Sequence, residues 1–359
     1  MLFEDLATEL VSHVFLSCSS IEDALALSST CHRFRQIYSS SQKLTILEHA
    51  AETQFGPLKD LTQLLTHNAS QPAHIPRSVP FSIALLKQVA HSGRVAEKWC
   101  DIYPFKKWKS NFEYRRLLTT DERYRVRRAL YRLWLYTHAF HNRTFPRETR
   151  VMKLTIQKRA GLLHNWSTAE LAEMADVHAV LREVIHSNVC PSNGTIARKF
   201  KKRFPENESQ QLLFNIHLNY PPPNNASSLF QSQYHSSPNV LSNHFHSTSA
   251  FNSRYGLSKF MPTPHHEPGA EGWGDDIPHY YVVEDMLKLD PEQIMWLKEN
   301  APLKGQVEMF VKRLGDWFEN NGETWGQTLE WVLEERGEDV GEILGAVADG
   351  ELGIAIFED

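Results

Sequence analysis

The chain has 359 residues, of which 41% are hydrophobic and 23% are charged, so it can bury a sizeable core and hold two or three domains. Its formal net charge of −5 at pH 7 gives no global reason to expect a nucleic acid or an anionic membrane as a partner. The four cysteines lie far apart without a Cys-x-x-Cys pair, which argues against both a disulfide framework and a zinc site.

The charges near the N-terminus and the length of the apolar runs indicate the cellular compartment of the protein. The first residues include Glu4, Asp5 and Glu9 but no early Lys or Arg, so the positive region of a signal peptide is missing. No apolar run approaches the roughly 18 residues that span a bilayer. We therefore expect a cytoplasmic or nuclear protein, or one found in both compartments, with reduced thiols and no membrane partner.

The charges are distributed unevenly along the chain. Residues 94–159 contain 18 Lys and Arg against 6 Asp and Glu, whereas residues 267–359 contain 6 against 23. Because opposite charges attract, we predict that the acidic C-terminal region packs on the basic middle of the chain.

Apolar residues recur at spacings of three and four almost everywhere, and strict alternation is scarce. The predicted fold class is therefore all-α. We divide the chain into an N-terminal three-helix module at 1–42, an irregular helical domain at 43–220, a disordered insertion at 221–280 and an acidic helical region at 281–359.

The N-terminal module is predicted to contain three short helices. The first begins near Thr8, a suitable N-cap, the second at Ser20 and the third near Thr30. The first helix carries a narrow apolar stripe made of Leu10, Val11, Val14 and Phe15. Helices this short cannot hide all their apolar surface from water, so some of it is left for a partner or for the rest of the chain.

Further helices are predicted after the module, separated by clear breaks. Breaks are expected at Gly56-Pro57 and around Pro72 to Pro80. A long helix should begin after Thr120, a plausible N-cap, and the capping box Ser167-x-x-Glu170 should open another. On the apolar face of that second helix lies His178, which we interpret as a core histidine with its hydrogen bonds satisfied.

Composition changes sharply after Tyr220, where the chain becomes rich in Ser, Asn, His and Pro. Such a segment cannot bury enough apolar area to offset its ordering entropy, so we predict disorder. It contains a group of histidines that makes a metal site conceivable: His235, His244, His246, His265 and His266. Flexible ligands lose entropy on binding, however, and we interpret the group as a solvated polar tract.

Order is predicted to return in the acidic C-terminal region. Asp290 provides an N-cap, followed by a proline at the first helical position and a capping-box partner. An amphipathic helix is then expected from Val307 to Phe318. Short helices should follow, divided by Gly322, Gly337 and Gly341.

No catalytic motif is present. The sequence lacks a Walker loop, GxGxxG, GxSxG, HExxH and a catalytic cysteine signature. We therefore predict no catalytic residue, no cofactor and no metal, and a metabolic enzyme is the least favoured alternative. The basic stretch from Lys106 to Arg132 mixes cations with Trp and Tyr as nucleic-acid surfaces do. A solvated helix face, or pairing with acidic residues of the same chain, explains the same pattern and is favoured over nucleic-acid binding.

Three N-terminal segments together resemble the F-box family. Leu6-Ala7-Thr8-Glu9-Leu10 matches its opening Leu-Pro-x-Glu-Leu, and Val14-Phe15 matches an aliphatic-Phe pair one helical turn later. The closing pattern, Cys-(basic or polar)-x-(Phe/Trp)-(basic)-x-(aliphatic), is matched from Cys31 to Ile37. Ala7 replaces the usual proline, so ordering this segment should cost somewhat more on binding. The resemblance covers about residues 2–42, and the remainder is similar, without diagnostic motifs, to the helical regions of fungal F-box proteins.

The resemblance implies that the module binds the Skp adaptor of cullin-RING ubiquitin ligases, and through it a cullin. The implied adaptor-binding surface is Leu6, Ala7, Leu10, Val14, Phe15 and Leu25, whereas Cys31 and Phe34 would hold the three helices together. The implied function is a substrate receptor of an SCF-type ligase that recruits an unknown protein target.

Two alternatives stay open at the module itself. An F-box scaffold would bind the adaptor without promoting ubiquitination. Otherwise the apolar side chains would pack against residues 41–92 of the same chain, because periodicity alone cannot separate an internal partner from an external one.

Overall fold

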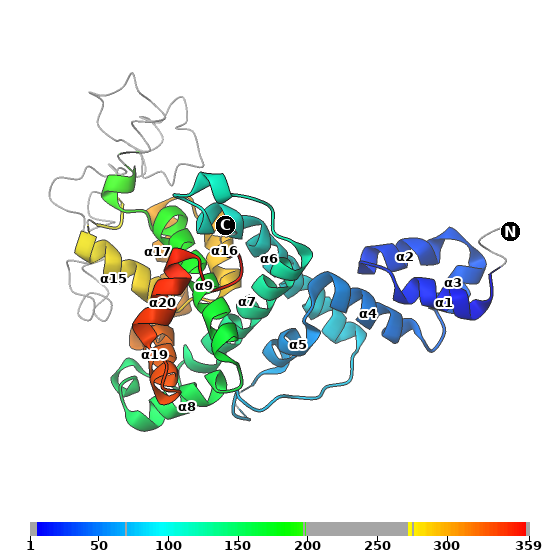
Figure 1. Ribbon diagram of the computed structural model, residues 1–359, viewed down its shortest axis with the longest axis horizontal. Helices are drawn as coiled ribbons and strands as arrows, with labels where there is room; N and C mark the ends of the chain where they lie inside the picture. The colour runs from blue at the N-terminus through cyan, green and yellow to red at the C-terminus, as the bar shows by residue number, and fades with distance from the viewer. Residues whose placement is uncertain (1–5, 69, 197, 199–271, 275, 357–359) are drawn as a thin grey trace, which may run out of the picture. The chain divides into compact units, whose positions relative to one another are not determined.

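The computed structural model describes residues 6–68, 70–196, 198, 272–274 and 276–356. Within these residues the regular secondary structure is helical and contains no strand, which confirms the predicted all-α class (Figure 1). Most of the predicted insertion, including the five histidines named above, lies outside the described residues. Helix α15 (Asp276–Met286) nevertheless begins inside the range predicted to be disordered, so the prediction is wrong for residues 276–280.

The chain divides into two compact units, which do not follow the four predicted ranges. Unit 1 comprises 1–139, 161–177 and 333–359, and unit 2 comprises 140–160 and 178–332. The N-terminal module therefore belongs to a larger unit, and both the predicted middle domain and the acidic region contribute to each unit. The units follow spatial packing, which composition along the chain does not report.

Unit 1 begins with three short helices, α1 (Thr8–Leu16), α2 (Ile21–Thr30) and α3 (His32–Tyr38), grouped at the blue end of Figure 1. Ser20 caps α2 as predicted, because its hydroxyl accepts the Asp23 N–H at 3.0 Å. Thr8 does not cap α1: it is the first helical residue, and Ala7 holds the cap position without a side-chain hydrogen bond. The cap of α3 is Cys31, whose sulfur accepts the Phe34 N–H at 3.4 Å.

The breaks predicted after the module are confirmed. Helices α4 (Lys43–Phe55) and α5 (Leu58–Thr66) flank Gly56-Pro57, and residues 67–82 separate α5 from α6 (Ile83–Lys107). Helices α4 and α6 approach each other closely at Gly93, because a Cβ built there would lie 2.4 Å from the Phe55 ring. Only glycine fits this contact.

A short 3₁₀ helix, η2 (Phe112–Tyr114), leads to α7 (Thr120–Phe140), and α9 (Thr168–Val184) follows later. The N-cap of α7 is Thr119 and not the predicted Thr120: the Thr119 hydroxyl accepts the Glu122 N–H at 3.2 Å, and the Glu122 carboxylate accepts the Thr119 N–H at 2.7 Å. The capping box of α9 is confirmed, with the reciprocal Ser167 and Glu170 bonds at 3.0 and 3.3 Å. Helix α20 (Val340–Asp349) ends at Gly350, which has the left-handed conformation.

Unit 2 draws on the remaining elements: η3 (Arg147–Thr149), α8 (Lys153–Leu163), the π-helical turn η4 (Ile185–Val189), α15, α16 (Pro291–Asn300), α17 (Lys304–Leu314), α18 (Asp316–Asn320) and α19 (Trp325–Glu335). The capping box at Asp290 is confirmed. The single helix predicted from Val307 to Phe318 is wrong, because Gly315 at φ 78° separates α17 from α18. Gly341 also lies inside α20 and divides nothing.

Candidate functional site

The three N-terminal helices share a small core around Phe15. Its ring lies 6.4 Å from Phe34, edge to face, and 6.0 Å from Tyr38, and its side chain is 0% exposed. Val11 and Ala24 are buried beside it in the same module. Phe34 therefore packs as the resemblance implies. Phe15 does not: it belongs to the core and not to the accessible surface, because two rings of α3 cover it.

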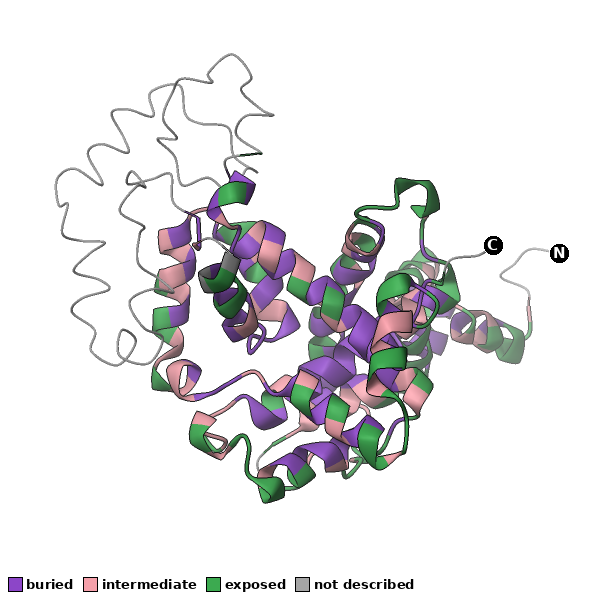
Figure 2. Cartoon of the chain, turned by 60° about the vertical axis from the view of Figure 1, so that its left-hand side comes forward, coloured by how far each residue is buried: buried purple, intermediate pink, exposed green. Residues whose placement is uncertain are grey.

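Other residues of the implied adaptor surface remain accessible. Leu10 is 52% exposed and Leu25 is 47% exposed, Ala7 is exposed, and Leu6 and Val14 are half-buried. Figure 2 shows mostly exposed and intermediate residues on the short helices beside the N label. We refer to Leu6, Ala7, Leu10, Val14 and Leu25 as the N-terminal apolar surface. Exposed leucines keep apolar area in contact with water, and a partner that covers them removes this unfavourable contact.

The backbone at Ala7 has the conformation that proline would impose. Its φ of −57° and ψ of 147° fall within the range that a pyrrolidine ring fixes, about −65 ± 15° in φ. The segment is also tied to α3, because an Arg33 guanidinium nitrogen donates to the Leu6 carbonyl at 2.5 Å. The folded chain therefore holds this segment ordered without the proline of the family pattern.

Cys31 has a different role from the one implied. The residue is partly exposed, and its sulfur caps the first turn of α3. It fixes where that helix starts, whereas the aromatic core is formed by other side chains.

Part of the module is covered by the chain itself. Helix α4 contacts both α1 and α2 and buries Ile46, Leu47 and Ala50. The Gln54 side chain of α4 accepts the Ile21 N–H at 3.0 Å and donates to Glu22 at 2.9 Å. Packing against residues 41–92 thus accounts for one side of the module, and the exposed leucines belong to what is left.

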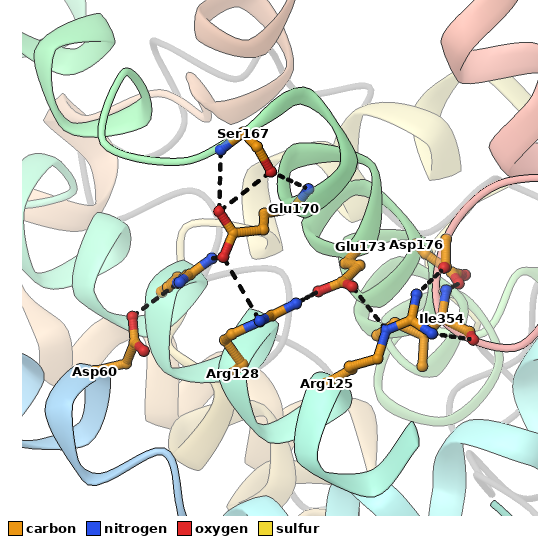
Figure 3. Close-up of polar contacts among 10 residues, drawn as sticks. Asp60, Arg125, Arg128, Ser167, Glu170, Glu173, Asp176 and Ile354 are labelled. Atoms are coloured by element: carbon orange, nitrogen blue, oxygen red, sulfur yellow. Dashed lines mark hydrogen bonds and ion pairs between the residues drawn. The ribbon is translucent and has the colours of Figure 1, made fainter. Parts of the chain in front are cut away.

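The basic stretch is neutralised by carboxylates on neighbouring helices of unit 1. Five arginines of α7 make charged hydrogen bonds: Arg123 to Glu97 and Asp101, Arg125 and Arg128 to Glu173, Arg127 to Glu97, and Arg132 to Asp60. Arg132 also forms an ion pair with Glu170. Figure 3 shows the part of this network that joins α7 to α9 and to Asp60 of α5. The Arg128–Glu173 and Arg132–Asp60 distances are 2.6 and 2.7 Å. Paired arginines are poorly placed to neutralise phosphates, which favours the structural interpretation of the stretch.

A groove of about 440 Å³ lies between α4, α5 and the segment before α6. Its lining includes the apolar Leu58, Val79 and Phe81 and charged side chains of both signs. No sequence pattern predicted this groove, because residues 72–80 were interpreted only as a proline-rich break.

His178 and Glu323 are among the groups of unit 2 whose pKa values are strongly displaced. Burial lowers the pKa of His178 to about 3, and its Nε2 finds no hydrogen-bond partner among the described residues. The predicted satisfied histidine is thus wrong at that atom. Burial raises the pKa of Glu323 to about 7, although its carboxylate accepts the Trp325 N–H at the start of α19. Neither group was singled out as catalytic by its sequence context.

None of the described helices is both long and apolar enough to cross a membrane. Within the same residues, no cluster of three or more His, Cys, Asp or Glu side chains has the arrangement of a metal site. The four cysteines, all described, are free thiols, and burial raises the pKa of Cys100 to about 12.

Comparison with known proteins adds no relative: no family model, no curated protein and no solved structure matches the chain.

Proposed function

We propose that helices α1–α3 dock the Skp adaptor in the manner of an F-box and that the chain is a substrate receptor of an SCF-type ubiquitin ligase. The observation that carries this proposal is the exposure of Leu10 and Leu25 on a module whose own core is already complete. Short amphipathic helices inserted into a partner groove are a recurrent mode of recognition. The order and spacing of the matching residues support it further.

The proposed mechanism is proximity. The adaptor holds the module, and another surface of the chain holds a protein target, so the lysines of the target gain effective concentration near a conjugating enzyme carried by other subunits. Chemistry is left to those subunits, and the target stays unnamed in this proposal.

The experiment is a pulldown of the full-length chain, read for both the adaptor and the cullin. The test variant is Leu10→Asp/Leu25→Asp, which puts charge on the exposed leucines and leaves Phe15 in place. The matched control is Leu117→Asp, an equally polar change at a leucine that is 86% exposed elsewhere in unit 1. We expect the wild type and the control to capture adaptor and cullin, and the double variant to lose at least about tenfold of both.

Each outcome separates the alternatives. Equal capture by the double variant and the control would refute docking through the N-terminal apolar surface. Capture of the adaptor without the cullin would favour the scaffold alternative over the ligase receptor. Far-UV circular dichroism of the double variant must match the wild type, since a collapsed module would lose binding for another reason.

A further inference from the structure

The residues after α20 form a short strap, residues 350–356, whose main chain is held by side chains of unit 1. We refer to the set of side chains around it as its cleft: Tyr103, Lys107, Arg125, Glu173 and Asp176. Two of its glycines have left-handed backbone, with φ of 80° at Gly350 and 112° at Gly353. Ile354 and Ala355 are 1% and 0% exposed. Residues 353–355, the middle of the strap, are thus buried as deeply as core residues are, whereas Glu351, Leu352 and Ile356 are exposed. The strap has no regular secondary structure of its own.

The cleft holds the strap mainly through backbone groups. The Asp176 carboxylate accepts the Ile354 N–H at 3.0 Å, and the Arg125 guanidinium donates to the Gly353 and Ile354 carbonyls at 2.6 and 3.3 Å (Figure 3). The Tyr103 hydroxyl faces the backbone N–H of Ala355. These groups bind main-chain atoms of the strap, whose backbone is bent over residues 351–355, and do not depend on its side chains.

The cleft is built without the strap. Asp176 receives a hydrogen bond from Tyr103 at 2.5 Å and an ion pair from Lys107 at 2.8 Å, and Glu173 holds Arg125 at 2.7 Å. All five side chains come from α6, α7 and α9. Asp176 and Lys107 are almost fully buried, with side-chain exposures of 1% and 9%.

Buried charges are costly unless their remaining hydrogen-bonding capacity is used. An apolar set of similar volume is often as stable as a buried ion pair, so stability alone is a weak explanation for Asp176 and Lys107. Binding of a peptide backbone explains these charges better. The Asp176 carboxylate can accept a further hydrogen bond, and the Arg125 guanidinium can donate to further acceptors. The strap supplies both.

Side-chain selectivity comes from the space around the strap. A Cβ at Gly353 would lie 2.5 Å from an Asp176 carboxylate oxygen, and the positive φ there also favours glycine. The next two positions are enclosed and hold an isoleucine and an alanine. The cleft therefore fits a glycine followed by an aliphatic and a small residue.

We propose that this cleft is a peptide-binding site for a Gly-aliphatic-small segment of a partner protein that adopts the same bent backbone, and that the strap is its occupant within the chain. A tethered occupant has an effective concentration in the millimolar range, so a free segment competes only when the strap is weakened or the segment is abundant. This proposal is independent of adaptor docking, since it uses other helices and another ligand.

The test uses the full-length chain with Gly353→Val, which should unseat the strap and leave every side chain of the cleft intact. The probe is a fluorescein-labelled synthetic peptide of residues 350–356, measured by fluorescence anisotropy. We expect it to bind the variant at least about tenfold more tightly than the wild type, whose cleft is occupied. The same peptide with valine in place of the glycine is the matched control and should not bind. Adding Arg125→Gln to the variant should weaken binding at least about fivefold, because two backbone carbonyls lose their donor.

Failure of the peptide to bind a folded Gly353→Val chain overturns the proposal and leaves the strap as a fixed part of unit 1. If that variant does not fold, the wild type is tested alone, by hydrogen exchange at the Ile354 amide with and without about 1 mM peptide. Competition should speed exchange at least about tenfold, and the valine peptide should not. Unchanged exchange overturns the proposal equally.

Discussion

The N-terminal module and the α7–α9 helices contain the two surfaces that the sequence marks as unusual, and they differ in whether the chain satisfies them itself. The module keeps two leucines about half exposed, while the arginines of α7 meet carboxylates from α5, α6 and α9. Apolar area left in water favours association, whereas a charge that already has a partner must first give it up. An unusual residue type therefore points to an external partner only where the fold offers no internal one.

The largest expected effect tests the division between core and surface inside the module. Phe15→Ala removes a fully buried ring between Phe34 and Tyr38, so the free energy of unfolding should fall by about 3–5 kcal/mol. Leu10→Ala, one turn away and 52% exposed, should change it by less than about 0.5 kcal/mol. Urea denaturation followed by circular dichroism measures both, and similar losses would show that the leucine is also structural.

In the charged region, removing one central carboxylate should be nearly as damaging. Asp176→Ala leaves the Lys107 ammonium buried without its ion-pair partner and the Ile354 N–H without its acceptor. Breaking a buried pair from one side costs about 3–5 kcal/mol. The matched control is Arg123→Ala at a more exposed pair of the same region, with an expected cost below about 1 kcal/mol. Thermal and urea unfolding would contradict the assignment if the two variants behaved alike.

The pH dependence of stability tests the charged region with a smaller expected effect. Burial alone would raise the pKa of Glu170, but the Ser167 backbone N–H and the charges of Arg132 and Arg128 hold it below its usual value. A lowered folded-state pKa stabilises the fold above the unfolded value, near 4.5, and that stability is lost as the pH falls through the folded value.

Glu170→Gln should therefore lower the free energy of unfolding at pH 7 by about 1 kcal/mol and flatten its decline in acid. The measurement is a series of urea titrations from pH 7 to pH 3 on both chains. Parallel curves for the variant and the wild type would show that Glu170 does not contribute to the decline.

The smallest effect concerns the residue where the chain departs from the F-box pattern. Ala7 already has a φ that proline can adopt, so Ala7→Pro should stabilise the folded chain by about 0.4–1 kcal/mol by restricting the unfolded state. If adaptor docking is correct, adaptor binding should be retained or slightly strengthened, as read by the same pulldown. Destabilisation would mean that the Ala7 N–H or its surroundings cannot accept the ring.

Local signals in the sequence predicted local structure well. The caps at Ser20, Ser167 and Asp290 were predicted correctly because a helix cap depends on residues within one helical turn. Thr8 and Thr120 were misplaced because a hydroxyl beside a helix start does not by itself say which residue accepts the bond. Gly315 was missed because the apolar spacing continues across it, while its backbone turns left-handed.

Only part of the candidate site could be predicted from the sequence. A stripe such as Leu10, Val14 and Phe15 shows which residues share a helix face, but which of them the chain covers depends on α3 and α4. The complementary charges were visible in principle, since Glu170, Glu173 and Asp176 recur every three residues. The two glutamates face arginines of α7, and Asp176 faces Lys107 of α6. Nothing local indicated that the strap would join them.

Gly93 makes the position of the N-terminal helices depend on a residue of α6. Because the backbone of α6 packs directly against the Phe55 ring of α4, any side chain added there would displace α4. Helices α1 and α2 contact α4, so they would move with it. We therefore expect a substitution at this buried position to change the proposed adaptor docking while every surface residue stays the same.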